Sequence, residues 1–291
     1  MGKDLFEKCS VAREMFRQAD AILGVPLSKI CFDGPDDELR QTKNAQAAIF
    51  LHSMVLTKLI ETNDVAITAG HSLGEYSALA FAGAMSFEDG LKLVHLRGEL
   101  MQKAGEEQKG TMAAIIGLEP SIVGEVCCKA YPEGVVQSAN YNSPGQIVIS
   151  GSVTGVRKAM ELAKGHGARL VKELIVSGAF HSPLMQSARE GLAQALTLTQ
   201  IRDAIIPVYA NVTAKPVRKA EEIRTLLEEQ LTSAVRWEQS TINMINDGAR
   251  TFIEVGPGKV LQGLVKRIDG SVEVRGIDTY ADLERLTPVQ S

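Results

Sequence analysis

The chain has 291 residues, 45% of them hydrophobic and 23% charged, with a formal net charge of -4 and a pI near 5.8. A chain of this length can bury a sizeable core, either as one large domain or as a domain that carries an insertion. The mild acidity gives no reason to propose nucleic acid as a partner, and no uninterrupted apolar run reaches the length of a membrane span.

The cysteines predict no special chemistry. Cys9, Cys31, Cys127 and Cys128 have no CxxC spacing and no histidine cluster nearby. We therefore expect reduced packing residues, no metal site and, because the N-terminus carries no signal pattern, a cytoplasmic location with no membrane partner.

The first elements are expected to be helical. Residues 1–23 carry apolar side chains on one side among charges, which predicts a helix with no strand before it. Residues 24–37 are punctuated by Pro26, Gly34 and Pro35, which predicts a loop with room for a short helical turn. Residues 44–60 are apolar on nearly every side, which predicts a buried helix.

Residues 64–83 predict a strand, a sharp turn and an alanine-rich helix. The turn is GHSLG, which fits the GxSxG nucleophile elbow: Gly70 and Gly74 remove side chains where strand and helix crowd together, and Ser72 is held outward in a strained turn. GxSxG alone also fits an ordinary connection. The strand before it and the helix after it favour Ser72 as a nucleophile.

The next helix starts at Ser86, an N-cap residue type, with Asp89 completing an approximate capping box. At about 100° per residue, Arg97 falls in the middle of the apolar face that Leu93 and Met101 share. A buried guanidinium needs an anion, which is either a buried Asp or Glu of the protein or the carboxylate of a substrate. A candidate nucleophile one helix upstream favours the substrate carboxylate.

The pattern changes over residues 110–174. Four strand-like stretches (MAAIIG, VVQSANY, QIVISG and RLVKEL) and two helical ones follow one another in the order βαββαβ. This order is the split-βαβ signature of a ferredoxin-like unit, and its compactness indicates a small inserted subdomain. Its central hairpin turns at residues 142–145, where Pro144 followed by Gly145 fits a type II turn.

A candidate base follows this unit. The segment GAFHSPLM places His181 directly before Ser182 and Pro183, which are N-cap and N1 residue types. The positive end of a helix dipole disfavours imidazolium, and a general base requires a neutral imidazole. Capped loops also contain histidine by chance, but the presence of Ser72 favours His181 as its base.

Two more strands are expected, at residues 205–212 and 249–256, the second followed by a glycine turn and a helix. That turn lacks GxGxxG and a Walker lysine, so it gives little support to nucleotide binding. The elements together predict an α/β fold. Residues 1–109 and 175–291 are expected to form an α/β-hydrolase-like catalytic core with a mostly parallel sheet, and residues 110–174 a ferredoxin-like subdomain.

Several motifs occur in one order: GHSLGEY, an arginine four residues before a methionine on the next helix, KGTMAAIIGL, NYNSPGQIVISG, GAFHSPLM, VRW and EVGPGKVL. From Met1 to about Arg267, they resemble the malonyl-CoA:acyl carrier protein transacylase family of bacterial fatty acid synthesis. The resemblance implies a ping-pong transfer in which Ser72, activated by His181, takes the malonyl group from malonyl-CoA. The phosphopantetheine thiol of acyl carrier protein then receives it. Because the coenzyme A thioester is a substrate, no cofactor is implied.

The resemblance also implies how the substrate is held. Arg97 binds the free malonyl carboxylate as a bidentate pair, and Met101 and Phe180 shape the acyl pocket. The backbone carbonyl of Gln230 orients the His181 imidazole in place of the carboxylate of an ordinary triad. No aspartate is therefore expected in the site.

The remaining expected contacts concern the oxyanion and the pantetheine arm. The backbone NH of Leu73 gives one oxyanion donor, His71 is a substrate contact, and Asn142 and Gln146 face the pantetheine arm. Similar enzymes begin with a strand and a GQGSQ loop whose glutamine is the second donor, whereas this sequence starts after it, at MGKDL. Losing one such donor typically costs about 10²- to 10³-fold in rate. We therefore hypothesise a shortened gene model rather than a natural active form.

Two other classes of protein share parts of this pattern. A serine esterase or thioesterase of α/β-hydrolase type has the same elbow, but it uses water as the acceptor and normally has an acid partner for histidine. A catalytically impaired module that binds carrier protein without turnover is consistent with the missing GQGSQ segment. Arg97 and the inserted βαββαβ unit favour the transferase.

Overall fold

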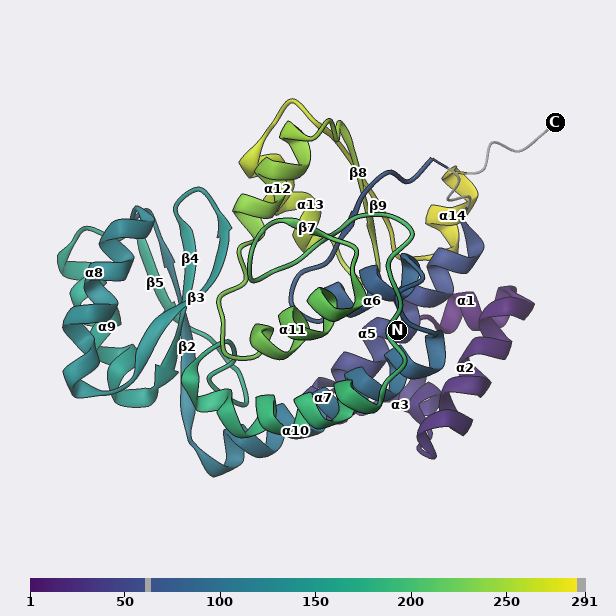
Figure 1. Cartoon of the computed structure of the whole chain (residues 1–291), viewed down its shortest axis with the longest axis horizontal. Coiled ribbons are helices and arrows are strands. Elements are labelled where there is room, and N and C mark those ends of the chain that lie inside the picture. Colours follow the sequence, from purple (N-terminus) through teal and green to yellow (C-terminus); the bar gives the residue numbers. More distant parts are fainter. Residues whose placement is uncertain (61–63, 287–291) are drawn as a thin grey trace.

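The structure, a computed structural model, describes residues 1–60 and 64–286, so the last residues of the expected core segment 175–291 lie outside the described part. Figure 1 shows a larger, mainly helical body on the right and a smaller sheet with two helices on the left. The fold is a mixed α/β fold.

Helices dominate the described chain. They are α1 (Lys3–Lys8), α2 (Ser10–Leu23), α3 (Leu27–Asp33), α4 (Asp36–Arg40), α5 (Thr42–Leu59), α6 (Gly74–Phe81), α7 (Phe87–Glu107), α8 (Pro120–Ala130), α9 (Val153–Gly165), α10 (Gln186–Leu198), α11 (Ala220–Gln230), α12 (Trp237–Asn246), α13 (Val260–Ile268) and α14 (Tyr280–Leu286), with the 3-10 helices η1 (Tyr131–Glu133) and η2 (Pro183–Met185). The strands are β1 (Thr68–Ala69), β2 (Gly110–Ile116), β3 (Val136–Ser143), β4 (Gln146–Ser152), β5 (Leu170–Glu173), β6 (Val208–Tyr209), β7 (Pro216–Val217), β8 (Thr251–Val255) and β9 (Glu273–Ile277).

The N-terminal region differs from the expected single helix and loop. The first helical segment breaks at Cys9, whose backbone is extended, and residues 24–37 contain all of α3 and the start of α4. Ile30 and Cys31 follow Leu27 by three and four residues, so all three lie on one side of α3. That side is buried against the core. The loop prediction was wrong because tertiary burial stabilises helix despite the local prolines and glycine.

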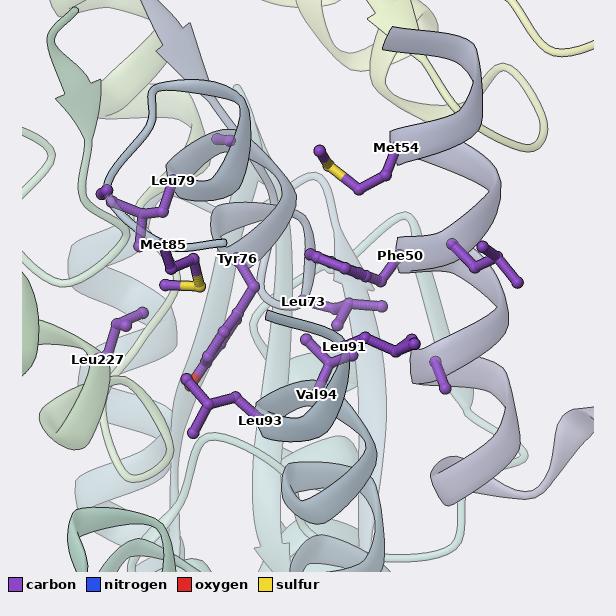
Figure 2. Close-up of a cluster of buried hydrophobic side chains, with 14 of the residues drawn as sticks. Phe50, Met54, Leu73, Tyr76, Leu79, Met85, Leu91, Leu93, Val94 and Leu227 are labelled. Carbon is purple, nitrogen blue, oxygen red and sulfur yellow. The ribbon is translucent and has the colours of Figure 1, made fainter. Parts of the chain in front are cut away.

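Two long helices, α5 and α7, pack against each other in the larger body. Gly98 of α7 allows their close approach, because a Cβ at this position would lie 2.6 Å from the Cα of Lys43. Figure 2 shows Phe50 projecting from α5 toward Leu91 and Val94 of α7. The predicted buried helix at residues 44–60 is therefore confirmed as α5, and its partner is the helix that carries Arg97.

The sheet of the larger body is split in two, whereas we expected one mostly parallel sheet. β1 pairs with β6 in parallel and β6 with β7 antiparallel, while β8 and β9 form a separate parallel pair. β1, β6 and β7 are two residues long each, so few ladder hydrogen bonds define this sheet. The stretches predicted as longer strands continue instead as loops that lead into the site.

The smaller unit follows the expected element order. Strands β2 to β5 form a four-stranded antiparallel sheet in the order β3-β4-β2-β5, and α8 and α9 pack together over its buried side. The β3–β4 hairpin turns at Pro144 and Gly145, and Gly145 has a φ of 66°, as a type II turn requires at this position. In Figure 1 both helices lie on the outer side of the sheet.

Strand β3 joins the smaller unit to the larger body. The Tyr141 N–H donates to the Val235 carbonyl at 2.9 Å, and the Val235 N–H donates to the Ala139 carbonyl at 2.8 Å. The Gln137 side-chain amide donates to the carbonyls of His181 and Thr232 at 2.9 and 3.1 Å. These bonds place the end of the small sheet beside the predicted catalytic residues.

In the described ranges, no helix is long and apolar enough to span a membrane. Over the same residues, no three His, Cys, Asp or Glu side chains are grouped so that they could hold a metal ion. The four cysteines are free thiols.

Candidate active site

The turn between β1 and α6 has the geometry of a nucleophile elbow. Ser72 has a φ of 51°, in the left-handed region that non-glycine residues rarely adopt. At Gly70 a Cβ would lie 1.9 Å from the carbonyl carbon of Gly74, so only glycine fits there. At Gly74 a Cβ would have no neighbour within 4 Å. The expectation that both glycines relieve crowding is therefore met by Gly70 alone.

The Ser72 hydroxyl, the His181 imidazole and the Gln230 backbone carbonyl form a chain of two hydrogen bonds. The Ser72 hydroxyl and His181 Nε2 are 2.8 Å apart, and His181 Nδ1 lies 2.9 Å from the Gln230 backbone carbonyl. A carbonyl can only accept, so Nδ1 carries the proton and Nε2 is left as the acceptor for the serine hydroxyl. This is the arrangement that general-base activation of a serine requires.

His181 lies where imidazolium is strongly disfavoured. Its side chain is 3% exposed, and burial together with the nearby Arg97 charge lowers its pKa from 6.5 to about 3. Ser182 caps the short 3-10 helix η2 through the Leu184 N–H, and α10 begins only after it. The neutral imidazole expected from a helix dipole is thus favoured mainly by burial and by the arginine.

Arg97 is 1% exposed, and its guanidinium lies beside the Ser72 hydroxyl. Its Nη2 donates to Ser72 Oγ at 3.1 Å and to Gln230 Oε1 at 2.9 Å, and its Nη1 donates to Gln46 Oε1 at 2.6 Å. The Tyr76 ring lies 5.5 Å from its guanidinium carbon. In the part of the chain that the structure describes, Arg97 forms no ion pair with a carboxylate, and its Nε has no hydrogen-bond partner. The alternative of a structural salt bridge is therefore not what the structure contains.

Three residues of the site were not predicted from the sequence. Glu75 is 2% exposed, and its Oε2 accepts from the Gln230 side-chain amide at 2.7 Å and from the Asn211 N–H at 3.0 Å. Burial raises the Glu75 pKa to about 7. The third residue is Gln46, which anchors Arg97. Glu75 and Gln46 are polar residues inside apolar helices, which is only a weak sequence signal of a site. Asn211 lies at the end of a predicted strand, which is an equally weak signal.

Asn211 holds the elbow from the other side. Its Oδ1 accepts from the Ser72 N–H at 2.6 Å, and its Nδ2 donates to the Gly70 carbonyl at 2.7 Å. Both ends of its side-chain amide are thus bonded to the turn. The strained backbone of Ser72 is fixed by long-range contacts as well as by its own sequence.

The predicted pocket residues surround this centre. Met101 is buried one turn after Arg97 on α7, and its sulfur accepts from the Gln46 amide at 3.4 Å. Phe180 is partly buried and packs against two hydrophobic clusters. One is the core of the larger body, and the other is formed by Met112, Ala139 and Val148 of the small sheet. The Leu73 N–H donates to no acceptor of the described residues, so it is free to bind an oxyanion.

The two hairpin residues predicted to contact substrate, Asn142 and Gln146, lie in different surroundings. His71 Nε2 and Asn142 Oδ1 are 2.9 Å apart, which ties the hairpin to the elbow, and burial lowers the His71 pKa. Gln146 instead accepts from Arg267 of α13 at 2.6 Å, and among the described residues it forms no hydrogen bond with Ser72 or His181. The structure thus brings Asn142 next to the elbow and leaves Gln146 at its periphery.

The acyl transferase domain family matches residues 1–284 of the chain. A malonyl CoA-acyl carrier protein transacylase of Bacillus subtilis is 46% identical over 287 residues, which cover 98% of this chain and 90% of the relative.

Solved structures give the same answer. An acyl-carrier-protein-S-malonyltransferase from Bartonella henselae has a TM-score of 0.94 and 40% identity, with 98% of this chain and 93% of that one covered. A malonyl-transacylase solved in complex with a type II PKS acyl-carrier protein has a TM-score of 0.94 and 36% identity, with 97% of this chain and 93% of that one covered. The resemblance seen in the sequence is confirmed. The chain belongs to the acyl transferase domain family, among the malonyl CoA-acyl carrier protein transacylases.

Proposed function

We propose that the chain transfers a malonyl group from malonyl-CoA to the phosphopantetheine thiol of acyl carrier protein, for fatty acid synthesis. The observation that carries the proposal is the position of Ser72 Oγ, which lies 2.8 Å from His181 Nε2 and 3.1 Å from Arg97 Nη2. A base and a cation thus meet at one nucleophile. The names of the relatives at 36–46% identity support the same substrates.

In the first half-reaction, His181 Nε2 takes the proton of the Ser72 hydroxyl while Oγ attacks the thioester carbonyl. The C–S bond breaks, the sulfur of coenzyme A leaves with the proton from His181, and a malonyl-serine ester remains. The thiol of the carrier protein then reverses these steps: it gives its proton to His181, attacks the ester, and releases Ser72. The Gln230 carbonyl holds the imidazole in the tautomer that both halves need.

Arg97 supplies the selectivity for an acid-bearing acyl group. The malonyl carboxylate is separated from the reacting carbonyl by one methylene, so it lies within reach of a guanidinium that contacts Ser72 Oγ. Arg97 is bonded to neutral oxygens only, which leaves its charge available to a substrate carboxylate. Met101 and Phe180 shape the acyl pocket, and the Leu73 N–H is the oxyanion donor.

The finer fold class belongs to the same proposal. We infer an α/β-hydrolase-like core of residues 1–109 and 175–291, supported by the elbow between β1 and α6, and a ferredoxin-like subdomain of residues 110–174, supported by its strand order. No cofactor is needed for this chemistry. A cytoplasmic location, and substrate contacts by His71, Asn142 and Gln146, also stay predictions.

The test is incubation with malonyl-CoA, acetyl-CoA and methylmalonyl-CoA in separate reactions, followed by intact-mass analysis of the chain and of added carrier protein. We expect a malonyl adduct that is absent in Ser72→Ala and is passed on to the carrier. Arg97→Ala should reduce malonyl transfer while sparing acetyl transfer. Release of free malonate without carrier transfer would instead indicate an esterase or thioesterase, and no adduct at all would indicate a binding module.

A further inference from the structure

Glu75 is a buried carboxylate that takes no part in the transfer mechanism proposed above. It follows the nucleophile by three residues and lies on the first turn of α6. Its side chain is 2% exposed, and in the described structure it forms no ion pair. A buried charge without a cation is costly, so the hydrogen bonds that Glu75 accepts must offset that cost.

Glu75 is connected to both backbone polar groups of the nucleophile. Its Oε2 accepts from the Asn211 N–H, and the Asn211 side chain accepts from the Ser72 N–H. The same Oε2 accepts from Gln230 Nε2, which also donates to the Ser72 carbonyl at 3.0 Å. Two hydrogen-bonded paths therefore connect one Glu75 carboxylate oxygen to Ser72. The path through Asn211 reaches the Ser72 N–H, and the path through Gln230 reaches the Ser72 carbonyl.

Glu75 also decides which way the Gln230 amide points. A carboxylate only accepts, so the NH2 group of Gln230 must face Glu75, and Oε1 must face Arg97 Nη2 at 2.9 Å. With the amide reversed, an NH2 group would meet the guanidinium donor to donor. The orientation of Gln230 is therefore the link between Glu75 and Arg97.

This link keeps the negative charge one amide away from Arg97. A carboxylate in direct contact with the guanidinium would occupy the donors that a substrate carboxylate needs. Gln230 and Gln46 hold Arg97 through neutral oxygens instead, and Glu75 offsets part of its charge from the far side of Gln230.

We propose that Glu75 is a positioning residue: through Gln230 and Asn211 it fixes the Ser72 backbone and the Arg97 guanidinium together, and so sets the preference for a carboxyl-bearing acyl group. The proposal rests on the malonyl transfer proposed above. It assigns a role to the glutamate of GHSLGEY that does not involve contact with the substrate.

The test measures the rate at which Ser72 is acylated by malonyl-CoA and by acetyl-CoA, in the full chain and in its variants. In Glu75→Ala the malonyl-to-acetyl rate ratio should fall by roughly 10-fold or more, the size expected when a buried donor loses its partner. Glu75→Asp keeps the charge but withdraws the oxygens by one methylene, so the ratio should fall there too. Glu75→Gln keeps an acceptor oxygen, so its ratio should stay within roughly threefold of the unaltered chain.

Glu254→Ala is the matched control. Glu254, like Glu75, accepts two hydrogen bonds, but its donors are the backbone N–H groups of Leu261 and Gln262 at the start of α13, at 3.0 and 3.1 Å. Its removal should lower the melting temperature and leave the ratio unchanged. An unchanged ratio in Glu75→Asp, or in a folded Glu75→Ala, overturns the inference and leaves the proposed function standing. Absence of a malonyl adduct on the unaltered chain overturns both.

Discussion

The two residues that do the proposed chemistry both have strained backbones. Ser72 has a φ of 51° and His181 a φ of 58°. Such a conformation costs a non-glycine residue about 1–3 kcal/mol and persists only where the surroundings impose it. Asn211 and Gln230 do so at Ser72, and Gln137 binds the His181 carbonyl. In these backbone conformations the Ser72 hydroxyl and the His181 imidazole lie within hydrogen-bond distance, at 2.8 Å.

The protonation state of His181 leads to a prediction at this scale. Its pKa is lowered to about 3 by burial and by Arg97, so the base stays neutral where an ordinary histidine would be protonated. The rate of Ser72 malonylation should therefore change less than about threefold between about pH 7 and about pH 5. Stopped-flow measurement at subsaturating malonyl-CoA checks this.

Glu75, with a pKa raised to about 7 by burial, titrates inside the same window, so the profile is also measured in Glu75→Gln. A fall of about tenfold per pH unit below about pH 6.5 in that variant would show that His181 is protonated like a solvent-exposed histidine. Burial and Arg97 would then not keep His181 neutral in this range.

At the scale of elements, the elbow depends on how closely α6 approaches the end of β1. Gly70 allows this approach, because a Cβ there would lie 1.9 Å from the Gly74 carbonyl carbon and 2.5 Å from the Glu75 nitrogen. Both of those atoms are backbone, so no side chain can rotate away. The clash would push α6 and its glutamate off the strand.

Gly70→Ala should therefore lower the free energy of unfolding by about 2 kcal/mol or more. Gly74→Ala is the paired control: its Cβ would meet open space, and alanine in a first helical turn should raise that free energy by about 0.5–1 kcal/mol. Urea unfolding of the two variants measures both changes. An equal decrease in the free energy of unfolding in both variants would show that Gly70 is not needed for the close approach of β1 and α6.

For the whole molecule, stability should depend on buried groups that titrate near neutral pH. Burial lowers the pKa of His52, His71 and His181 from 6.5, and it raises the pKa of Glu75 from 4.5 to about 7. As the pH falls below about 6.5, the three histidines bind protons more readily in the unfolded chain than in the folded one, while Glu75 binds a proton more readily in the folded chain. On balance the unfolded state gains at most two protons.

The free energy of unfolding should thus decrease with falling pH, by at most about 2.7 kcal/mol per unit between about pH 6.5 and about pH 5, at about 1.36 kcal/mol for each net proton. Replacing His52, whose ring bonds to Asp278 at 2.9 Å, should make this slope shallower, because its pKa is lowered in the folded chain. Urea unfolding of the chain and of His52→Gln across this range gives the two slopes. A stability that rises on acidification would contradict the directions of the histidine shifts.

The sequence by itself determined the features that depend on near neighbours. A run that is apolar on nearly every side located α5, and hydrophobic periodicity located α7. The residue types Ser86 and Asp89 located a cap in which the Asp89 N–H donates to Ser86 at 3.0 Å, and alternating strand and helix patterns gave the βαββαβ order. Each of these patterns repeats within a few residues. The inward position of Arg97 also followed from periodicity alone, because it places one charged side chain on an apolar face.

The tertiary structure alone decided what holds that arginine and the nucleophile in place. Gln230 lies 158 residues from Ser72 and 155 from Glu75, and Asn211 lies 139 from Ser72. Hydrogen bonds between such distant groups leave no periodic trace, and a buried amide looks in sequence like any surface amide. The same limit applied to α3, where burial against distant helices outweighed local loop-forming residues. Local patterns predicted the reacting groups, and long-range packing set the distances between them.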